Sequence, residues 1–410
     1  MPLPKYWLGV FLAAAIPALP TVAQENSQIL PQGRFSLGVK YLGGRVQDRW
    51  TTDGNREPLA QPVNRAVTFR RLAKHKSSFE RTKIQAFLAT QGWSMEDEVG
   101  RYQADMDAQV QATALVLGYG LTSKTSVAIG VPVIRAHTRV KVGFQSGLRG
   151  RQFVAQLADP GVNLGGEAAR AAAELTDAVA ELDANLTDYG YAPLTNWQDQ
   201  GVGDIQLGMK HQWHRDAAQT AAVLAGVVLP TGRTDDPDLL TDVPFGDGGF
   251  DLFAGLAWDT QQNRYWNSFL FGKWIHQLPF KKTVRLTTAE ETVFAGKTQA
   301  EFKPGDVVQG GTGTRLQAAN GVGLGGGLLA ERRFGDTYRN LPGDSKRYHE
   351  GETDSVVYNA MAEVGYDSTT QFLQGKSQFP LITKASYLHQ LYGEQVAKAN
   401  TWQVDINVFF

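Results

Sequence analysis

The last stretch of the chain decides the fold: Trp402-Gln403-Val404-Asp405-Ile406-Asn407-Val408-Phe409-Phe410. Successive side chains of a strand point to opposite sides, so its apolar residues at even positions share one face. The polar residues at positions 403, 405 and 407 share the other face. Aromatic residues stand at both ends. This alternation is typical of a strand in a membrane barrel. A soluble antiparallel sheet with one solvated face has the same alternation, so the rest of the chain must decide between these two folds.

The same period of two recurs in residues 35–41, 205–213, 250–258 and 356–366. Each run has about ten residues, the length of a tilted strand that crosses a bilayer. Short connections at 122–124, 215–218 and 261–263 alternate with long ones at 42–105, 143–201, 231–248 and 277–304. Outer-membrane barrels have short periplasmic turns and long outer loops, whereas soluble sandwiches need no such alternation. The pattern therefore favours a membrane barrel.

The first residues predict export. Lys5 precedes the apolar run 7–16, and Thr21-Val22-Ala23 forms a small-x-small site before Gln24. This apolar run is shorter than the roughly 20 residues that span a bilayer as a helix. We therefore expect a signal peptide over 1–23 that is cleaved before Gln24.

Composition excludes several classes of protein. The 410 residues contain no cysteine, so neither a disulfide framework nor a thiolate site can form. With 40 basic and 41 acidic residues, the net charge of -1 offers no basic field for nucleic acid. The mean hydropathy of -0.28 excludes a polytopic helical membrane protein. It is compatible with barrel strands, in which apolar and polar residues alternate.

We predict an all-β fold, an antiparallel transmembrane β-barrel of about 12 strands with long extracellular loops, in a single domain over 24–410. Upward strands are expected to begin near Arg34, Thr125, Gln219, Arg264, Gly321 and Pro380, and downward strands near Met106, Gly203, Gly249, Gly305, Thr353 and Asn400. The even count places both termini on the periplasmic side. A hidden hairpin at 81–93 would raise the count to 14.

A helical insert is expected within the loop at about 144–200. Residues 167–186 are rich in alanine and place apolar residues at helical spacing. Two arrangements are open: a loop helix packed over the barrel mouth, or a gate that enters the lumen.

Side-chain parity predicts the residues that line the lumen, because a lysine facing lipid near the midplane costs about 2–4 kcal/mol. The expected lumen-lining residues are Lys40, Gln206, Lys210, Asn359, Glu363, Gln403, Asp405 and Asn407. The terminal strand resembles the final strand of outer-membrane barrels. In that resemblance Phe410, with Val408, Ile406 and Trp402 on its face, forms the signal that the barrel-assembly machinery recognises.

No motif predicts catalysis, a cofactor or a metal. On a strand, His211 and His214 point to opposite faces and cannot share a metal ion. The glycine-rich stretches 309–314 and 321–327 lack a phosphate-loop ending, and we interpret them as backbone facing a crowded lumen or marking a bend. The acidic loop 235–247 does not match a calcium-binding loop and is interpreted as solvated. We expect no enzyme activity.

Four segments follow one another in an order that resembles a known family: 119–127, Val131-Pro132, 201–210 and Leu229-Pro230-Thr231-Gly232. The family is the transporter-like outer-membrane family named for the meta-pathway of phenol degradation. The resemblance covers roughly residues 115–259. It implies passive uptake of small hydrophobic or aromatic compounds across the outer membrane of a Gram-negative bacterium, and it supplies no binding residues.

Two strands give independent support for an apolar passage. Residues 220–229 and 266–275 are apolar on both faces, whereas a water-filled porin keeps its lumen face polar. Packing under a plug or loop would explain the same pattern. The alternative function is a structural, adhesive or general-diffusion barrel without hydrophobic specificity. The expected partners are outer-membrane lipid and lipopolysaccharide, the assembly machinery and a small hydrophobic solute, with no nucleic acid.

Overall fold

The structure is a computed structural model that describes residues 26–61, 63–64, 66–73, 78–158, 173, 175–288 and 296–410. The predicted signal peptide over 1–23 lies outside the described residues. So does part of the predicted helical segment, namely residues 167–172 and 174.

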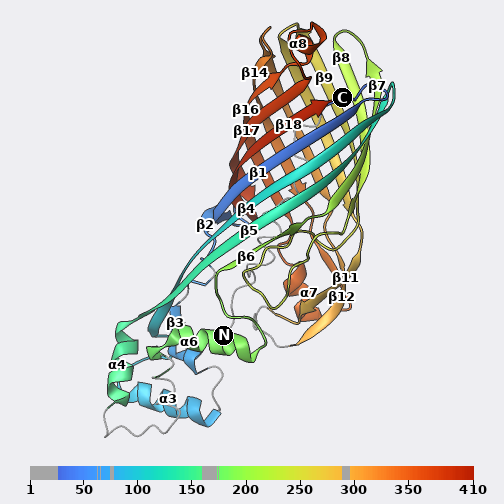
Figure 1. The fold of residues 1–410 in the computed structure, drawn as a ribbon. Helices are drawn as coiled ribbons and strands as arrows, with labels where there is room; N and C mark the ends of the chain where they lie inside the picture. Colours follow the sequence, from blue (N-terminus) through green and yellow to red (C-terminus); the bar gives the residue numbers. More distant parts are fainter. Residues whose placement is uncertain are drawn as a thin grey trace.

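Twelve strands of the described residues close into one antiparallel barrel (Figure 1). In chain order they are β1 (Phe35–Trp50), β4 (Glu98–Thr122), β5 (Thr125–Ser146), β7 (Ile205–Arg215), β8 (Gln219–Leu229), β9 (Asp251–Asn263), β10 (Trp266–Gln277), β13 (Val307–Gln317), β14 (Val322–Arg333), β16 (Ser355–Asp367), β17 (Leu381–Glu394) and β18 (Val396–Phe409). Strand β1 pairs with both β4 and β18, which closes the barrel and removes its edges. The predicted twelve-stranded barrel is confirmed.

The first and last strands meet as the terminal pattern predicts. Ser36 pairs with Phe409, and the backbones of Phe35 and Phe410 exchange hydrogen bonds of 2.9 and 3.2 Å. Both strand ends therefore lie at the end of the barrel where the connections are short. This is the periplasmic end in outer-membrane barrels.

Burial alternates along the barrel strands. On β18, Trp402 and Ile406 are 61% and 43% exposed, whereas Gln403 and Asp405 between them are 5% and 8% exposed. The outward positions of other strands carry the same kind of apolar side chain, including Leu37, Leu115, Leu117, Ile129, Leu207, Leu256, Leu270, Leu324, Leu328 and Val364. This belt is the surface that a bilayer would cover.

The strand expected to begin near Met106 begins at Glu98, so that expectation is wrong. Strands β4 and β5 have 25 and 22 residues and form a hairpin that projects well beyond the other strands (Figure 1). Their outward residues change from Ile129 and Val133 to Arg135 and Arg139. The change to charged residues marks the point where the hairpin leaves the lipid, and both strands continue beyond this point.

The hairpin expected as an alternative at 81–93 is a helix, α3 (Ser78–Thr90). Its Ile84, Phe87 and Leu88 are buried, at the spacing of one helix face. They pack in a hydrophobic cluster with α2 (Phe69–Leu72), α4 (Leu148–Leu157), α6 (Ala178–Asp188) and the far end of β4. Figure 1 shows this helical cluster at the tip of the long hairpin.

Helix α6 is the described part of the predicted helical insert. Its Ala178, Leu182 and Leu186 are buried in that cluster, and the Tyr102 hydroxyl donates to the Ala178 carbonyl oxygen at 3.0 Å. Residues 178–188 therefore pack at the hairpin tip, and this part of the insert does not enter the lumen. Among the described residues, no helix is long and apolar enough to cross a membrane.

A second, three-stranded sheet lies at the long-loop end of the barrel (Figure 1). It consists of β11 (Phe280–Arg285), β12 (Lys297–Lys303) and β15 (Thr337–Arg339), with α7 (Gly343–Glu350) beside it. Short strands β2 (Arg56–Pro58), β3 (Ala66–Thr68) and β6 (Trp197–Val202) extend the edges of β1, β4 and β5, and α8 (Thr369–Leu373) lies in the β16–β17 connection.

Candidate channel lumen and its mouth

The segment before β1 lies inside the barrel at the short-turn end. Ser27 is fully buried, and both its backbone N–H and its hydroxyl donate to Asp259 Oδ2, at 2.6 and 2.5 Å. Gln212 Nε2 donates to the Ser27 carbonyl oxygen at 3.0 Å. The Leu30 N–H donates to Ser126 Oγ at 2.7 Å. These contacts come from β5, β7 and β9, so the segment is fastened to this part of the barrel wall from inside.

The sequence gives no prediction of this segment. Residues 26–33 have no periodicity that would predict an element. One signal was available in the sequence: Asp259 follows Trp258 of the alternating run 250–258, so its side chain is expected on the inward face. A carboxylate at an inward position of a barrel strand requires a hydrogen-bonding partner.

Apolar side chains form a buried cluster inside the barrel. It contains Leu224, Ala257, Phe269, Phe271, Leu329, Met361 and Leu388, which come from β8, β9, β10, β14, β16 and β17. Two of these strands, β8 and β10, are the ones predicted to be apolar on both faces. Their inward residues Leu224, Phe269 and Phe271 belong to this one cluster, so a polar solute would face an apolar wall there.

The glycine-rich strands make room for these rings. A Cβ on Gly313 would lie 2.5 Å from Phe269 Cζ, and one on Gly311 would lie 2.7 Å from Phe271 Cε1. Real Cβ contacts do not reach such distances. For Gly311 and Gly313, the interpretation as glycines facing a crowded lumen is confirmed.

A cavity of about 310 Å³ lies between the N-terminal segment and the barrel wall. Gln28, Ile29 and Leu30 form one side of it, and residues of β1, β4, β5, β7, β8, β9, β10 and β18 form the other. Four of the predicted lumen-lining residues border this cavity: Lys40, Gln206, Lys210 and Gln403. The rest of the lining is mainly apolar, with Val116, Leu224 and Phe253 among its larger side chains.

The other four predicted residues lie on the β16–β18 side of the barrel. Glu363 is buried and pairs with Arg315 at 2.6 Å. Asp405 accepts from Gln403 Nε2 at 2.8 Å. Asn407 lies against Gly38 of β1, and Asn359 is half-buried opposite Leu329 of β14. The predicted set is thus divided between the cavity and a charged stretch of wall.

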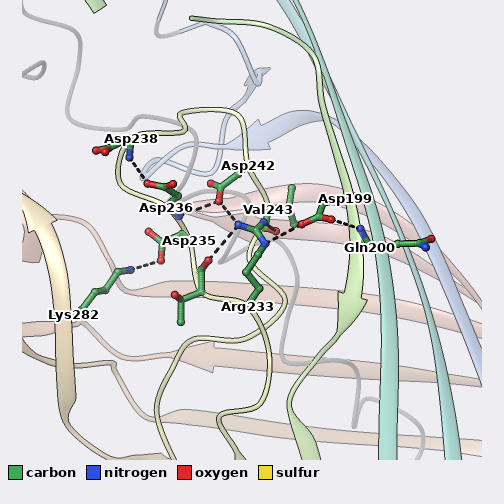
Figure 2. A network of polar contacts seen from close by, with 10 residues as sticks. Asp199, Gln200, Arg233, Asp235, Asp236, Asp238, Asp242, Val243 and Lys282 are labelled. Carbon is green, nitrogen blue, oxygen red and sulfur yellow. Dashed lines mark hydrogen bonds and ion pairs between the residues drawn. The ribbon is translucent and has the colours of Figure 1, made fainter. Parts of the chain in front are cut away.

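The loop that follows β8 folds over the long-loop end and is held by charge pairs (Figure 2). Arg233 lies between the rings of Trp197 and Phe245, at 5.0 and 5.1 Å from their centroids. Its guanidinium donates to the buried Asp242 at 2.9 Å and to the Val243 carbonyl oxygen at 2.8 Å, and it pairs with Asp199 at 3.2 Å.

Two other acids of this loop, Asp235 and Asp238, are also paired with cations. Asp235 binds Lys282 at 2.7 Å, and Asp238 binds Arg285 and Lys297. Burial acts to raise the pKa of Asp238, but the bonds from Lys297 and Arg285 hold it below its usual value. The interpretation of 235–247 as a solvated acidic loop is therefore wrong. The cations that pair with Asp235 and Asp238 lie about 50 residues further along the chain, so no local pattern in the sequence reveals them.

Arg285 joins the loop to the helical insert. Its guanidinium is 4% exposed, lies 3.6 Å from the centroid of the Tyr191 ring, and donates to the carbonyl oxygens of Tyr189 and Gly190, each at 2.7 Å. It also donates to Asp238 at 2.5 Å. One buried cation thus connects β11, the loop after β8 and the end of α6.

Two of the sequence segments that carried the family resemblance meet at this end. The Asp204 carboxylate accepts from the Gly232 N–H at 2.8 Å, and Thr231 Oγ1 donates to the Gly203 carbonyl oxygen at 2.8 Å. Burial raises the pKa of Asp204 to about 6, although the Gly232 N–H opposes this, and neighbouring Asp247 raises it further. These segments fix a turn of the wall and carry no reactive group.

Among the described residues, no group of three or more His, Asp or Glu is arranged to hold a metal ion. His211 Nδ1 lies 3.0 Å from Thr125 Oγ1, whereas His214 lies beyond the bulge that follows Gln212 and faces Asp216 at 3.2 Å.

Comparison with known proteins supports the family resemblance that the sequence predicts. The family described as putative MetA-pathway of phenol degradation matches residues 119–268. The resemblance predicted from the sequence is confirmed over this part of the chain. A search of the curated proteins finds no significant match.

Among solved structures, an outer membrane channel from Pseudomonas putida F1 is similar over 95% of this chain and 99% of its own, with a TM-score of 0.52 and 11% identity. At that identity the likeness concerns the fold. A toluene transporter from Pseudomonas putida (TM-score 0.34, 10% identity, 100% and 98% coverage) and a FadL homologue from Pseudomonas aeruginosa (0.35, 9%, 98% and 97%) are more remote. The chain thus has the fold of an outer-membrane β-barrel, as predicted.

Proposed function

We propose that this barrel is an outer-membrane channel for the passive uptake of small hydrophobic or aromatic molecules. The observation that carries the proposal is the apolar cluster inside the barrel, with the adjoining cavity of about 310 Å³. Ligand sites for apolar molecules are concave, mostly apolar and supplied with a few polar groups. The family match at residues 119–268 agrees with this function.

A general-diffusion porin is the weaker explanation. Such a barrel keeps a polar, water-filled interior, whereas Phe269, Phe271 and Leu329 are buried across this one. The N-terminal segment further narrows the short-turn end, where Ser27 is fastened to Asp259. A hydrated sugar would lose water against these side chains without gaining hydrogen bonds.

The lumen lining is part of the proposal. We assign Lys40, Gln206, Lys210, Asn359, Glu363, Gln403, Asp405 and Asn407 to the inner face. The support is the alternation of burial on the strands that carry them, together with the four that border the cavity. Access from outside is limited by the loop after β8, which Arg233 and Arg285 of β11 hold in place and which Arg285 joins to the end of α6.

The specific partners are also proposals. A belt of exposed apolar side chains supports contact with outer-membrane lipid and lipopolysaccharide. The exposed Phe410 and Trp402 on the last strand support recognition by the assembly machinery. The small-x-small site at Thr21-Val22-Ala23 supports processing before Gln24.

Uptake measured in cells tests the function. A Gram-negative strain lacking its general porins is compared with and without the protein, using labelled naphthalene and labelled glucose as solutes. We expect faster uptake of naphthalene and unchanged uptake of glucose when the protein is present. Faster glucose uptake with unchanged naphthalene uptake would identify a polar-solute porin. No change for either solute would favour the structural barrel.

A further inference from the structure

A groove of about 660 Å³ lies on the outside of the barrel, away from the lumen and its cavity. It is bordered by residues of β18, β1 and β4, which lie side by side in the sheet (Figure 1), and by Arg56 of β2. Tyr41 and Trp402 border it with rings that are 37% and 61% exposed. Between Tyr41 and Arg45 the wall carries only Gly43 and Gly44 and one inward side chain, so no outward side chain fills the groove there.

Strand register shows at which level of the membrane the groove lies. From the apolar belt towards the long-loop end, the cross-strand rows are Ile406–Val39–Leu115, Val404–Tyr41–Thr113, Trp402–Gly43–Gln111 and Asn400–Arg45–Gln109. The first row is apolar, aromatic rings follow, and amides and a cation come next. Rings of this kind mark the boundary between acyl chains and headgroups in membrane barrels. The groove therefore lies at the headgroup level of the outer leaflet.

The polar side chains of the groove are of two kinds. Four amides border it, Gln47, Gln109, Gln111 and Asn400, together with three cations, Arg45, Arg56 and Lys398. One acid of the described lining, Asp48, pairs with Arg56 at 2.7 Å and lies opposite Lys398 in the register. A second acid, Asp107 of β4, pairs with Arg45 at 3.1 Å. Acids and cations thus meet here, with the cations in excess.

The two ion pairs orient the guanidinium groups and leave some of their donors over. Arg45 donates to Asp107 through Nε, and Arg56 donates to Asp48 through Nη2. Each guanidinium carries five N–H donors, and the two side chains are 56% and 50% exposed. The planar fork of a guanidinium matches two oxygens of one phosphate. A phosphate could therefore bind here without breaking either ion pair.

We infer that this groove binds the phosphorylated sugar headgroup of lipopolysaccharide in the outer leaflet. The cations would meet its phosphates, and the amides, which both donate and accept, would meet its sugar hydroxyls. Its acyl chains would lie along the apolar row of Val39, Leu115 and Ile406. A phospholipid brings one phosphate and no sugar, so it would use fewer of these groups. The inference rests on the proposed contact with lipopolysaccharide, gives that contact a site, and does not depend on which solute crosses the lumen.

Binding of three lipids to the wild-type protein tests the inference. The full chain in detergent micelles is titrated with lipid A that carries two phosphates, the same lipid A with one phosphate, or phosphatidylglycerol, and native mass spectrometry measures the bound fraction. We expect the doubly phosphorylated lipid A to bind at least roughly tenfold more tightly than the singly phosphorylated form, as one charge-assisted hydrogen bond would give. Phosphatidylglycerol should bind most weakly.

The variants Arg45→Gln and Lys398→Gln, alone and together, locate the binding. The double variant should lose roughly tenfold in affinity for doubly phosphorylated lipid A and bind both forms of lipid A about equally. Lys124→Gln is the matched control, because Lys124 is exposed in the β4–β5 turn at the short-turn end. Equal binding of the three lipids by the wild type would overturn the inference, and so would an equal loss in the control.

Uptake of naphthalene separates this site from the channel function. Because the groove lies outside the barrel, the double variant should take up naphthalene as the wild type does. Uptake without preference for lipid A would overturn the site and leave the channel standing. Selective binding of lipid A by a protein that takes up no naphthalene would overturn the channel and leave the site standing. The wild-type lipid comparison needs no substitution, so it decides the matter even if a variant fails to assemble.

Discussion

The Asp204 carboxylate, at the start of β7, accepts a hydrogen bond from the backbone N–H of Gly232, just past the end of β8, at 2.8 Å. The loop from 231 to 249 begins at this contact and then crosses the long-loop end of the barrel. Gly246 returns to the same carboxylate so closely that a Cβ there would lie 2.6 Å from Asp204 Oδ2. One side chain therefore holds both ends of the loop.

We expect Asp204→Ala to loosen this loop without preventing barrel assembly. The substitution removes the carboxylate that accepts from the Gly232 N–H, and a hydrogen bond to a charged group contributes about 1.5–3 kcal/mol. Hydrogen exchange of residues 231–249, followed by mass spectrometry, should become faster. Asp204→Asn is the matched control, since its amide oxygen still accepts from Gly232. If exchange in the alanine variant equals that of the wild type, Asp204 does not hold the loop.

The folded loop around Asp204 should become more stable as the pH falls from about 6 towards 4, because protonation neutralises a buried carboxylate that lies near Asp247. The folded pKa of Asp204 is raised to about 6, above the unfolded value of about 3.9, so the folded state binds the proton more tightly. Burial raises the pKa of Asp247 in the same direction. Exchange of 231–249, corrected for its intrinsic pH dependence, should therefore be slower at pH 5 than at pH 7.5. In Asp204→Asn this difference should shrink, and an unchanged difference would assign it to another group.

The barrel was predictable because one face of each strand meets lipid and the other face meets the barrel interior. A shift of one residue on β18 would turn Asp405 towards lipid and Ile406 into the interior, so a single register is compatible with the sequence. The same logic located the glycines beside Phe269. It failed for β4 beyond Met106, because a strand that leaves the membrane loses the apolar half of its pattern.

The mouth and the N-terminal segment were not predictable for a different reason. Arg285 and Asp238 are 47 positions apart, and Ser27 and Asp259 are 232 apart. Such pairs leave no periodic signal, and each residue alone resembles an ordinary polar surface group. Only the closed barrel brings them together. The lysines that border the cavity were predictable only in part. Side-chain parity placed Lys40 and Lys210 on the inner face, but the alternation of apolar and polar residues did not predict that Lys273 lies at the same cavity.

Thiol labelling tests the register of the last strand. We expect cysteine at Gln403 or Asp405 to react with a small, charged, water-soluble methanethiosulfonate in intact outer membranes. Cysteine at Val404 or Ile406 should not react, because those residues belong to the lipid-facing belt. The chain has no cysteine of its own, so the background is low. The reverse pattern would mean that the strand is shifted by one residue.

Phe410 should matter for assembly because of its position and not because of its exposure alone. Its backbone exchanges hydrogen bonds with Phe35 and completes the seam between β1 and β18. Phe410→Asp should reduce the amount of heat-modifiable protein in the outer membrane several-fold. Phe379 is equally exposed, at 60%, in the connection before β17, so Phe379→Asp is the control. Equal losses of heat-modifiable protein in both variants would show that any charge at the membrane surface impairs assembly, and that the position of Phe410 has no special role.

The N-terminal segment should limit conductance, because Ser27 gives Asp259 two hydrogen bonds from inside the lumen. In Asp259→Ala both donors lose their charged acceptor, at a cost of about 1.5–3 kcal/mol for each bond. Release of the segment widens the short-turn end, so single-channel conductance in a planar bilayer should increase several-fold. Asp216→Ala is the control, because Asp216 is exposed on the β7–β8 turn, where it pairs with His214. Deleting residues 26–31 should raise conductance at least as far as Asp259→Ala does. If neither change alters conductance, the narrowest point of the channel lies at the apolar cluster around Phe269 and Phe271.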